Sequence, residues 1–339
     1  MTTFFGSIKQ VGGWKHCGLR FKFFALAFLL LLPVLSFTGC ATNTTLAGGA
    51  NLAKAGQSAA TQMQQNVTLS ANTILTLRKA VAFNDGYNGA VGNANSQQFL
   101  ANVSGIQGNL KKYASWLQSL SSSYAALGDL ANYDAAGNFN SSIASLAGDT
   151  TNLAAALGRP VAVPPDATAG VKVIGDLLIG SRQAHEIKQG SEHIESFLTN
   201  VISMLEAPAT KQQLTTIQKE VSGQIDQAAQ VLFDNGMSTY STLLDDIGAP
   251  LNLKTTSNAD EVVKANKQIL AGLKNVANES FAEQISAQGD AYDQSLSALK
   301  ALIPLHESLR NGAPLNLSSL TTIINQLQTT AAMFSAPTK

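Results

Sequence analysis

Cysteine is nearly absent from this sequence. Its 339 residues include only Cys17 and Cys40, and both lie close to the N-terminus. A domain formed by the rest of the chain therefore has no internal disulfide and no cysteine-based metal site, and its core must stabilise it. Charged residues make up 13% of the chain and aromatic residues 6%. No basic stripe is available to neutralise phosphates, so we expect no nucleic-acid partner.

The N-terminal segment combines basic charge with a hydrophobic run. Residues Phe23–Leu35 are apolar, interrupted by Pro33, and a short stretch with small residues leads to Cys40. A basic stretch, a hydrophobic run and a small-residue region, in this order, form an export signal. The stretch that precedes the run has no acidic residue and four basic ones, Lys9, Lys15, Arg20 and Lys22.

Phe37-Thr38-Gly39-Cys40 resembles the lipobox of bacterial lipoprotein precursors, although Leu is usual where Phe37 stands. The resemblance covers the signal region alone. It implies that residues 1–39 are a signal peptide cleaved before Cys40, whose sulfur receives a diacylglyceryl group. It also implies a membrane attachment through this lipid anchor. By the same resemblance, Ala41, at the position where Asp would favour retention, implies passage to the outer membrane, with the protein facing the periplasm of the bacterial cell envelope.

Two other interpretations of this segment remain open. Phe23–Gly39 is about 17 residues long, the lower limit for a transmembrane helix, and so could be an uncleaved membrane anchor. It could also be an ordinary secretory signal in which Cys40 has no role. Residues 40–50 contain Gly48 and Gly49 among small polar residues, and this composition predicts a flexible tether.

Helical periodicity dominates the chain after the tether. The spacing of apolar residues predicts a helix over about 96–132, with Ser96 as its N-cap. One apolar row recurs every seven residues and a second row lies between its members, which gives a single stripe over five heptads. The rows are Phe99, Ile106, Tyr113, Leu120 and Leu127, and Val103, Leu110, Leu117, Tyr124 and Ala131.

The same periodicity predicts further helices, and no segment shows the alternation of a strand. We expect an all-α fold, an elongated antiparallel bundle of about six or seven helices, several about 35 residues long. The N-terminal helices (51–158) and the C-terminal helices (167–335) meet at the Pro-rich stretch 159–166 and pack together as one bundle. The predicted helices cover about 50–82, 143–157, 167–206, from 214 onward, 258–299 with a capping box at Asn258 and Glu261, and 317–334; Pro304 should end or kink a helix.

The most charged stretch, Arg182–Glu195, is the best candidate for a metal site. Its two histidines, His185 and His193, are about 12 Å apart along a helix, so they cannot chelate one ion without ligands from another helix. A solvated helix face with the i,i+4 pairs Arg182–Glu186 and Lys188–Glu192 is the favoured interpretation. We therefore assign no metal ligand, cofactor-binding residue or cofactor.

Other partial motifs are weaker. Ser297 and Lys300 match Ser-x-x-Lys, but the companion motifs of that enzyme class are missing. The Asn84-Asp85-Gly86 stretch is better explained as a turn than as a calcium loop. Three aromatic residues lie on the 96–132 helix. Tyr113 and Tyr124 belong to the core stripe, whereas Trp116 at its edge could contact a partner. No catalytic residue is assigned.

These features predict a non-enzymatic, membrane-tethered helical scaffold or protein-interaction module that binds another envelope protein. A second hypothesis is a periplasmic binding module with a lipid or other small apolar ligand between helices, which requires a cavity of about 300 Å³ or more. A third is a bundle whose amphipathic helices insert into a membrane. Cys40 is the only site residue assigned, as the lipidation site.

Overall fold

The computed structural model describes residues 21–89, 93–132, 136–159, 180–211, 223–224, 227–232, 234–235, 241–248 and 252–335, with side chains from Asn43 onward. The parts described are helices and their connections, with no strand, so the all-α prediction is confirmed. The helices are α1 (Phe21–Tyr87), α2 (Ala94–Ala131), α3 (Ala136–Ala156), α5 (Gly180–Glu206), α7 (Ser241–Gly248), α8 (Ala259–Ala265), α9 (Lys267–Arg310) and α10 (Ser318–Ser335).

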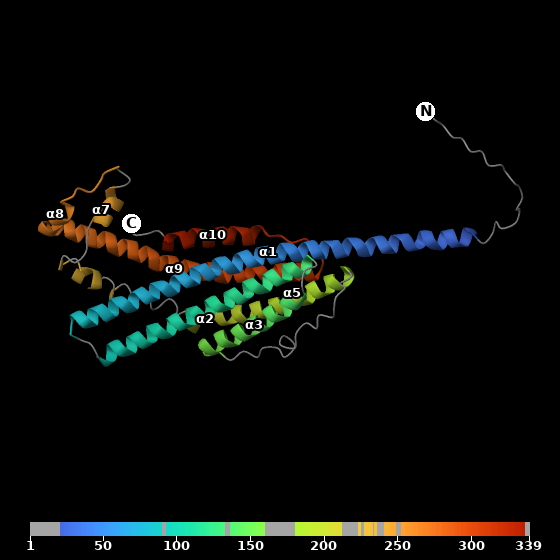
Figure 1. Ribbon diagram of the computed structural model, residues 1–339, viewed down its shortest axis with the longest axis horizontal. Coiled ribbons are helices and arrows are strands. Elements are labelled where there is room, and N and C mark those ends of the chain that lie inside the picture. The colour runs from blue at the N-terminus through green and yellow to red at the C-terminus, as the bar shows by residue number, and fades with distance from the viewer. Residues whose placement is uncertain are drawn as a thin grey trace, which may run out of the picture.

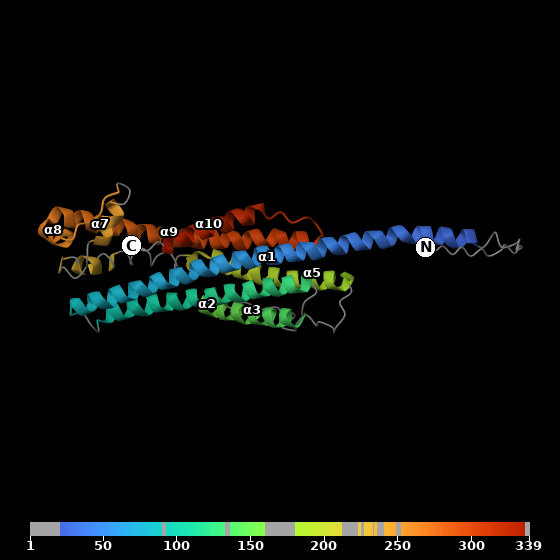
Figure 2. The same ribbon diagram turned by 45° about the horizontal axis from the view of Figure 1, so that its top comes forward.

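The long helices lie side by side and make an elongated molecule (Figures 1 and 2). Helices α1 and α2 run in opposite directions along much of their length, and α9 and α10 form a second antiparallel pair (Figure 1). The N-terminal part of α1 extends beyond the other helices at one end of the molecule. The short helices α7 and α8 lie at the opposite end, beside the start of α9 (Figure 2).

The main core is built by the stripe that the sequence predicts on α2. Val103, Leu110, Leu117 and Leu127 are buried there, and Phe99 and Ile106 are partly buried against the same cluster. Helix α2 spans Ala94–Ala131, close to the predicted 96–132. A heptad stripe predicts a helix well because burial of that one face is what stabilises the helix. The other core residues come mainly from α1, α3, α5, α9 and α10.

The start of α2 differs from the prediction. Its N-cap is Asn93, whose side chain accepts a hydrogen bond from the Asn95 backbone N–H. Ser96 lies inside the first turn, and its hydroxyl donates to Asp85 Oδ1 at 2.8 Å. The prediction of Ser96 as the cap was wrong because Asn93, three residues earlier, satisfies the free N–H groups at the helix start.

The expected flexible tether is helical where the structure describes it. Helix α1 continues through residues 43–50 without a break, and Thr45 and Gly49 are buried. Both glycines meet other helices: a Cβ at Gly48 would lie 3.1 Å from Leu309, and one at Gly49 would lie 2.8 Å from Ile187. The two glycines therefore serve close helix packing in this structure, and the prediction from composition alone missed the contacts that order them.

The long helix predicted over 258–299 is divided in the structure. Asn258 does precede α8, but its side chain makes no capping hydrogen bond and accepts from Thr256 Oγ1 instead. Helix α8 ends at Ala265, and the Asn266 side chain caps α9 by accepting from the N–H groups of Gln268 and Ile269. Helix α9 then continues through Pro304 to Arg310, so Pro304 does not end it.

Several predictions fall on residues outside the described ranges. These are the Pro-rich stretch after Arg159, the first half of the 167–206 helix and the start of the helix expected from Leu214. Of the 167–206 helix, the structure describes α5 from Gly180. Residues 1–20 and the side chain of Cys40 are likewise outside the description.

Candidate functional site

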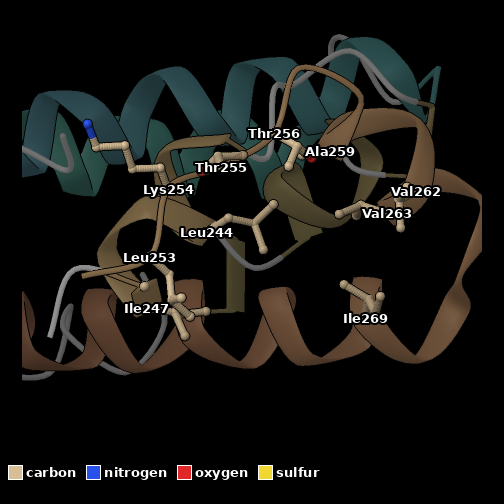
Figure 3. Close-up of a pocket in the computed structure, with 11 residues that line it drawn as sticks. Leu244, Ile247, Leu253, Lys254, Thr255, Thr256, Ala259, Val262, Val263 and Ile269 are labelled. Carbon is tan, nitrogen blue, oxygen red and sulfur yellow. The ribbon is translucent and has the colours of Figure 1, made fainter. Parts of the chain in front are cut away.

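An apolar pocket of about 350 Å³ lies between α7, α8 and the beginning of α9. Figure 3 shows apolar side chains from both sides of this space, with Leu244 and Ile247 on α7 and Ile269 on α9. Helices α7 and α8, which contribute to its lining, lie at the end of the molecule opposite to the start of α1 (Figure 1). Its lining consists of Leu244, Ile247, Gly248, Leu253, Lys254, Thr255, Thr256, Ala259, Val262, Val263 and Ile269.

Contacts between the end of α7 and the segment that begins at Asn252 form one wall of the pocket. Gly248 ends α7, and its carbonyl accepts a hydrogen bond from the Leu253 N–H at 3.0 Å. A Cβ at Gly248 would lie 3.1 Å from the Leu253 carbonyl oxygen, so the chain approaches this closely because the residue is glycine. Asn252 adopts a φ of 55°, a left-handed conformation that Asn tolerates in turns.

A side-chain contact also joins these two segments. The Asp245 carboxylate on α7 accepts hydrogen bonds from the Thr255 N–H, at 3.2 Å, and from the Thr255 hydroxyl. This bridge joins α7 to the segment that carries Leu253 and Lys254. The wall of the pocket is thus positioned by residues that are local in sequence, from Asp245 to Thr255.

The pocket sits on a small hydrophobic cluster of its own. Val263 and Leu273 are each only 2% exposed and are contacted by Ala229, Leu244 and Leu270, apart from the main core. The rim is far more open. Among the described residues, eight large hydrophobic side chains are exposed, and four of them line this pocket: Ile247 (47%), Leu253 (62%), Val262 (47%) and Ile269 (37%). Exposed apolar surface concentrated in this way marks an interaction site.

A second cluster, buried and polar, lies deep in the main bundle. His306 on α9 is fully buried and bonds at both ring nitrogens, with Tyr124 Oη of α2 at 2.7 Å and Ser191 Oγ of α5 at 2.7 Å. A neutral imidazole has one donor and one acceptor nitrogen, so one hydroxyl donates to the ring and the other accepts from it. The three side chains join α2, α5 and α9 at one point.

The electrostatics of this polar cluster keep it uncharged. Burial, together with the nearby Arg310 charge, lowers the pKa of His306 to about 3, and the Ser191 hydrogen bond opposes this only in part. Burial raises the pKa of Tyr124 well above its ordinary value, and the Glu195 charge adds to this. Burial also raises the pKa of Glu195, although Arg310 lies 3.2 Å away. Because the imidazole and the two hydroxyls bond to one another and come from three helices, the cluster is suited to fixing helix positions.

The Arg182–Glu195 stretch does not form the solvated face that the sequence predicted. His185 is exposed, but Glu186 is buried with its Oε2 unpaired, and Gln183 is buried with its side-chain N–H donating to the Leu130 carbonyl. The ion pairs found among the described residues include neither Arg182–Glu186 nor Lys188–Glu192. The prediction was wrong because several polar residues of α5 face the bundle. No cluster of three or more His, Cys, Asp or Glu residues suited to a metal ion is present in the described part of the chain.

The remaining sequence candidates are engaged in local contacts. Trp116 is fully buried, and its indole N–H donates to Thr150 Oγ1 at 2.9 Å, so the expectation that it could face a partner was wrong. Tyr113 and Tyr124 are buried in the core as predicted. The Ser297 hydroxyl donates to the Asp293 carbonyl, whereas Lys300 pairs with Glu206, so the two residues do not act on each other.

Of the calcium candidate, the Asn84 side chain donates to the Gln224 backbone carbonyl at 2.8 Å, and Asp85 binds Ser96. Sequence reasoning missed the pocket. Apolar Leu244, Ile247, Leu253 and Val262 were visible, but they fall in short segments that meet only through tertiary contacts, such as the hydrogen bond from the Leu253 N–H to the Gly248 carbonyl.

Comparison with known protein families, curated proteins and solved structures finds no match for this chain. Within the parts of the chain that the structure describes, no helix is long and apolar enough to span a bilayer.

Proposed function

We propose that this protein is a non-enzymatic lipoprotein of the bacterial cell envelope that binds a small apolar ligand at the end of a helical bundle. The pocket between α7, α8 and α9 is the observation that carries this proposal. Its volume of about 350 Å³ falls in the range of ligand sites, about 300–1,000 Å³, and its lining is mostly apolar. It thereby meets the cavity requirement of the binding-module hypothesis.

The proposed lipid anchor lies far from this pocket. The Phe37-Thr38-Gly39-Cys40 sequence supports lipidation and cleavage at Cys40, and Ala41 supports an outer-membrane location facing the periplasm. Cys40 lies in the N-terminal part of α1, and the N-terminal end of α1 points away from α7 and α8 (Figure 1). The 48 residues from Cys40 to Tyr87, the end of α1, correspond to about 70 Å of helix. A bundle of about six or seven helices, as expected, would present the binding site at this distance from the bilayer.

The test compares the lipids that copurify with the wild-type protein and with a variant whose pocket is filled by a larger side chain. Leu244→Trp places a large side chain in the pocket, whereas Met333→Trp adds the same side chain at a residue on α10 that is 55% exposed and outside it. Organic extracts of the purified proteins are compared by mass spectrometry. We expect an apolar compound with the wild type and with Met333→Trp, and its loss with Leu244→Trp. The same compound at the same yield from all three proteins contradicts the proposal.

A protein-interaction scaffold is the second candidate function. The rim of the pocket favours it, because Leu253 is 62% exposed and Val262 is 47% exposed. Such side chains can enter the interface with another envelope protein. A photocrosslinking amino acid at Leu253 tests this candidate, with the same amino acid at Met333 as the matched control. A discrete crosslinked partner from position 253 alone supports the scaffold, and adducts that are equal at both positions contradict it.

A further inference from the structure

The pocket that we assign to ligand binding has one charged residue in an otherwise uncharged lining. Lys254 is that residue, and the other ten lining residues are aliphatic side chains, threonines and a glycine. Figure 3 shows Leu244, Ile247 and Ile269 about the apolar space, while Lys254 extends away from it so that its amino group lies at the periphery. With one charged residue at the edge of an apolar lining, the pocket can hold the apolar part of a ligand inside and its charged end at the periphery.

The Lys254 amino group is available to a ligand. It is exposed, and the four ion pairs of the described residues involve other lysines and Arg310. The Asp245 carboxylate on α7 is already bound by the N–H and hydroxyl of Thr255. Asp260, on α8, has an interaction of its own. Lys254 belongs to the pocket lining and carries its charge on a flexible four-carbon stem, so its amino group can turn toward an anionic group at the mouth of the pocket.

The volume limits the apolar part of the ligand. About 350 Å³ corresponds to roughly a dozen water volumes, which is the scale of one medium-length acyl chain. A phospholipid with two long chains exceeds that space. The exposed rim residues Leu253 and Val262 can cover the part of a chain that protrudes.

Resting on the proposed function, we infer that the ligand is a free fatty acid, with its acyl chain among Leu244, Ile247 and Ile269 and its carboxylate at Lys254. The apolar wall supplies most of the affinity, about four-fold for each methylene group that becomes buried. The ion pair is exposed to solvent and contributes less, about two- to five-fold. Lys254 therefore sets the orientation of the ligand and the preference for an acid over an alcohol.

The experiment uses photoreactive dodecanoic acid and photoreactive dodecanol on the full-length protein in envelope membranes. The crosslinked peptides are mapped by mass spectrometry, and half-saturating concentrations are measured by competition with the unlabelled compounds. Lys254→Gln removes the cation. Lys264→Gln, on α8 and outside the lining, is the matched control that removes one exposed lysine nearby.

We expect saturable labelling between residues 244 and 269, with the acid favoured over the alcohol by about two- to five-fold. Lys254→Gln should abolish this preference and leave labelling by the alcohol unchanged, whereas Lys264→Gln should leave both unchanged. Equal affinity of the wild type for acid and alcohol overturns the fatty-acid assignment and leaves an apolar binding site. A lack of saturable labelling by both compounds in this segment overturns the assignment and also the proposed function.

Discussion

Gly56 is the position at which one added methyl group should most clearly disturb the packing of α1 against α2. A Cβ built there would lie 2.4–2.5 Å from three ring atoms of Tyr124. The Tyr124 ring cannot move aside easily, because it is fully buried and its hydroxyl is bonded to His306. In Gly56→Ala the two helices must therefore separate or shift.

The expected cost follows from two opposing effects. Overpacking a filled core costs about 1–3 kcal/mol, and a contact as short as this one belongs at the upper end. Replacing glycine by alanine inside a helix returns up to about 1 kcal/mol. Gly56→Ala should therefore destabilise the protein by about 2 kcal/mol. At about 2 °C per kcal/mol for a chain of this size, Tm should fall by about 4 °C.

Gly105→Ala is the matched control, because nothing lies within 4 Å of the corresponding Cβ on α2. Only the helix-propensity gain of up to about 1 kcal/mol applies there, so Tm should stay the same or rise by up to about 2 °C. Thermal unfolding of both variants is followed by circular dichroism at equal protein concentration. In a Tyr124→Leu background, which removes the ring, the cost of Gly56→Ala should shrink. A Gly56→Ala protein at least as stable as the wild type would refute the close approach of α1 to Tyr124.

Three further predictions test the core and the anchor. Burial lowers the pKa of His306 to about 3, below its ordinary value of 6.5, so the unfolded state gains a proton first and stability should fall by about 1 kcal/mol between pH 7 and 5.5; urea unfolding at these two pH values measures this, and a loss of the same size in His306→Gln contradicts it. Trp116→Phe should cost about 1–3 kcal/mol, since it leaves the buried Thr150 hydroxyl without its indole donor; a Tm unchanged within 1 °C in thermal unfolding argues against that contact. Cys40→Ser should abolish incorporation of labelled palmitate and release the protein from membranes, while its circular dichroism matches that of the wild type; retained label places the lipid elsewhere.

Sequence periodicity predicted the parts of the fold that depend on one helix face. Helix α2 was located to within two residues at each end, because its apolar rows had to face the core for the helix to be stable. Helix ends were less predictable. Asn93 displaced Ser96 as the N-cap, and Asn266 divided a helix that its apolar pattern made continuous. Which of several neighbouring residues caps a helix depends on the geometry of their side chains, and amino-acid composition does not determine that geometry.

The roles of the glycines could not be assigned without the tertiary structure. At Gly105, Gly108, Gly223 and Gly272, nothing from a neighbouring helix lies within 4 Å of an added Cβ. Close packing occurs at other glycines, including Gly56, and Gly190 against Phe139. A glycine shows its role only when the opposite helix is placed.

The candidate pocket depends still more on long-range structure. Its lining comes from α7, α8, the start of α9 and the segment between α7 and α8, which meet through tertiary contacts such as the hydrogen bond from the Leu253 N–H to the Gly248 carbonyl. Each segment alone has too few apolar residues for a clear periodic pattern. In the sequence, nothing separates Lys254 from the other lysines. Its position in the lining of an apolar pocket distinguishes it in the structure.

Helix α1 runs without interruption from the proposed anchor residue Cys40 into the bundle. With lipid chains on that cysteine, the folded domain would be attached to the bilayer through a rigid helix and not through a flexible linker. The tilt of this helix relative to the bilayer would then set the range of distances from the membrane surface at which the pocket meets its ligands. A run of flexible residues inserted just after Cys40 would leave the pocket intact and widen that range.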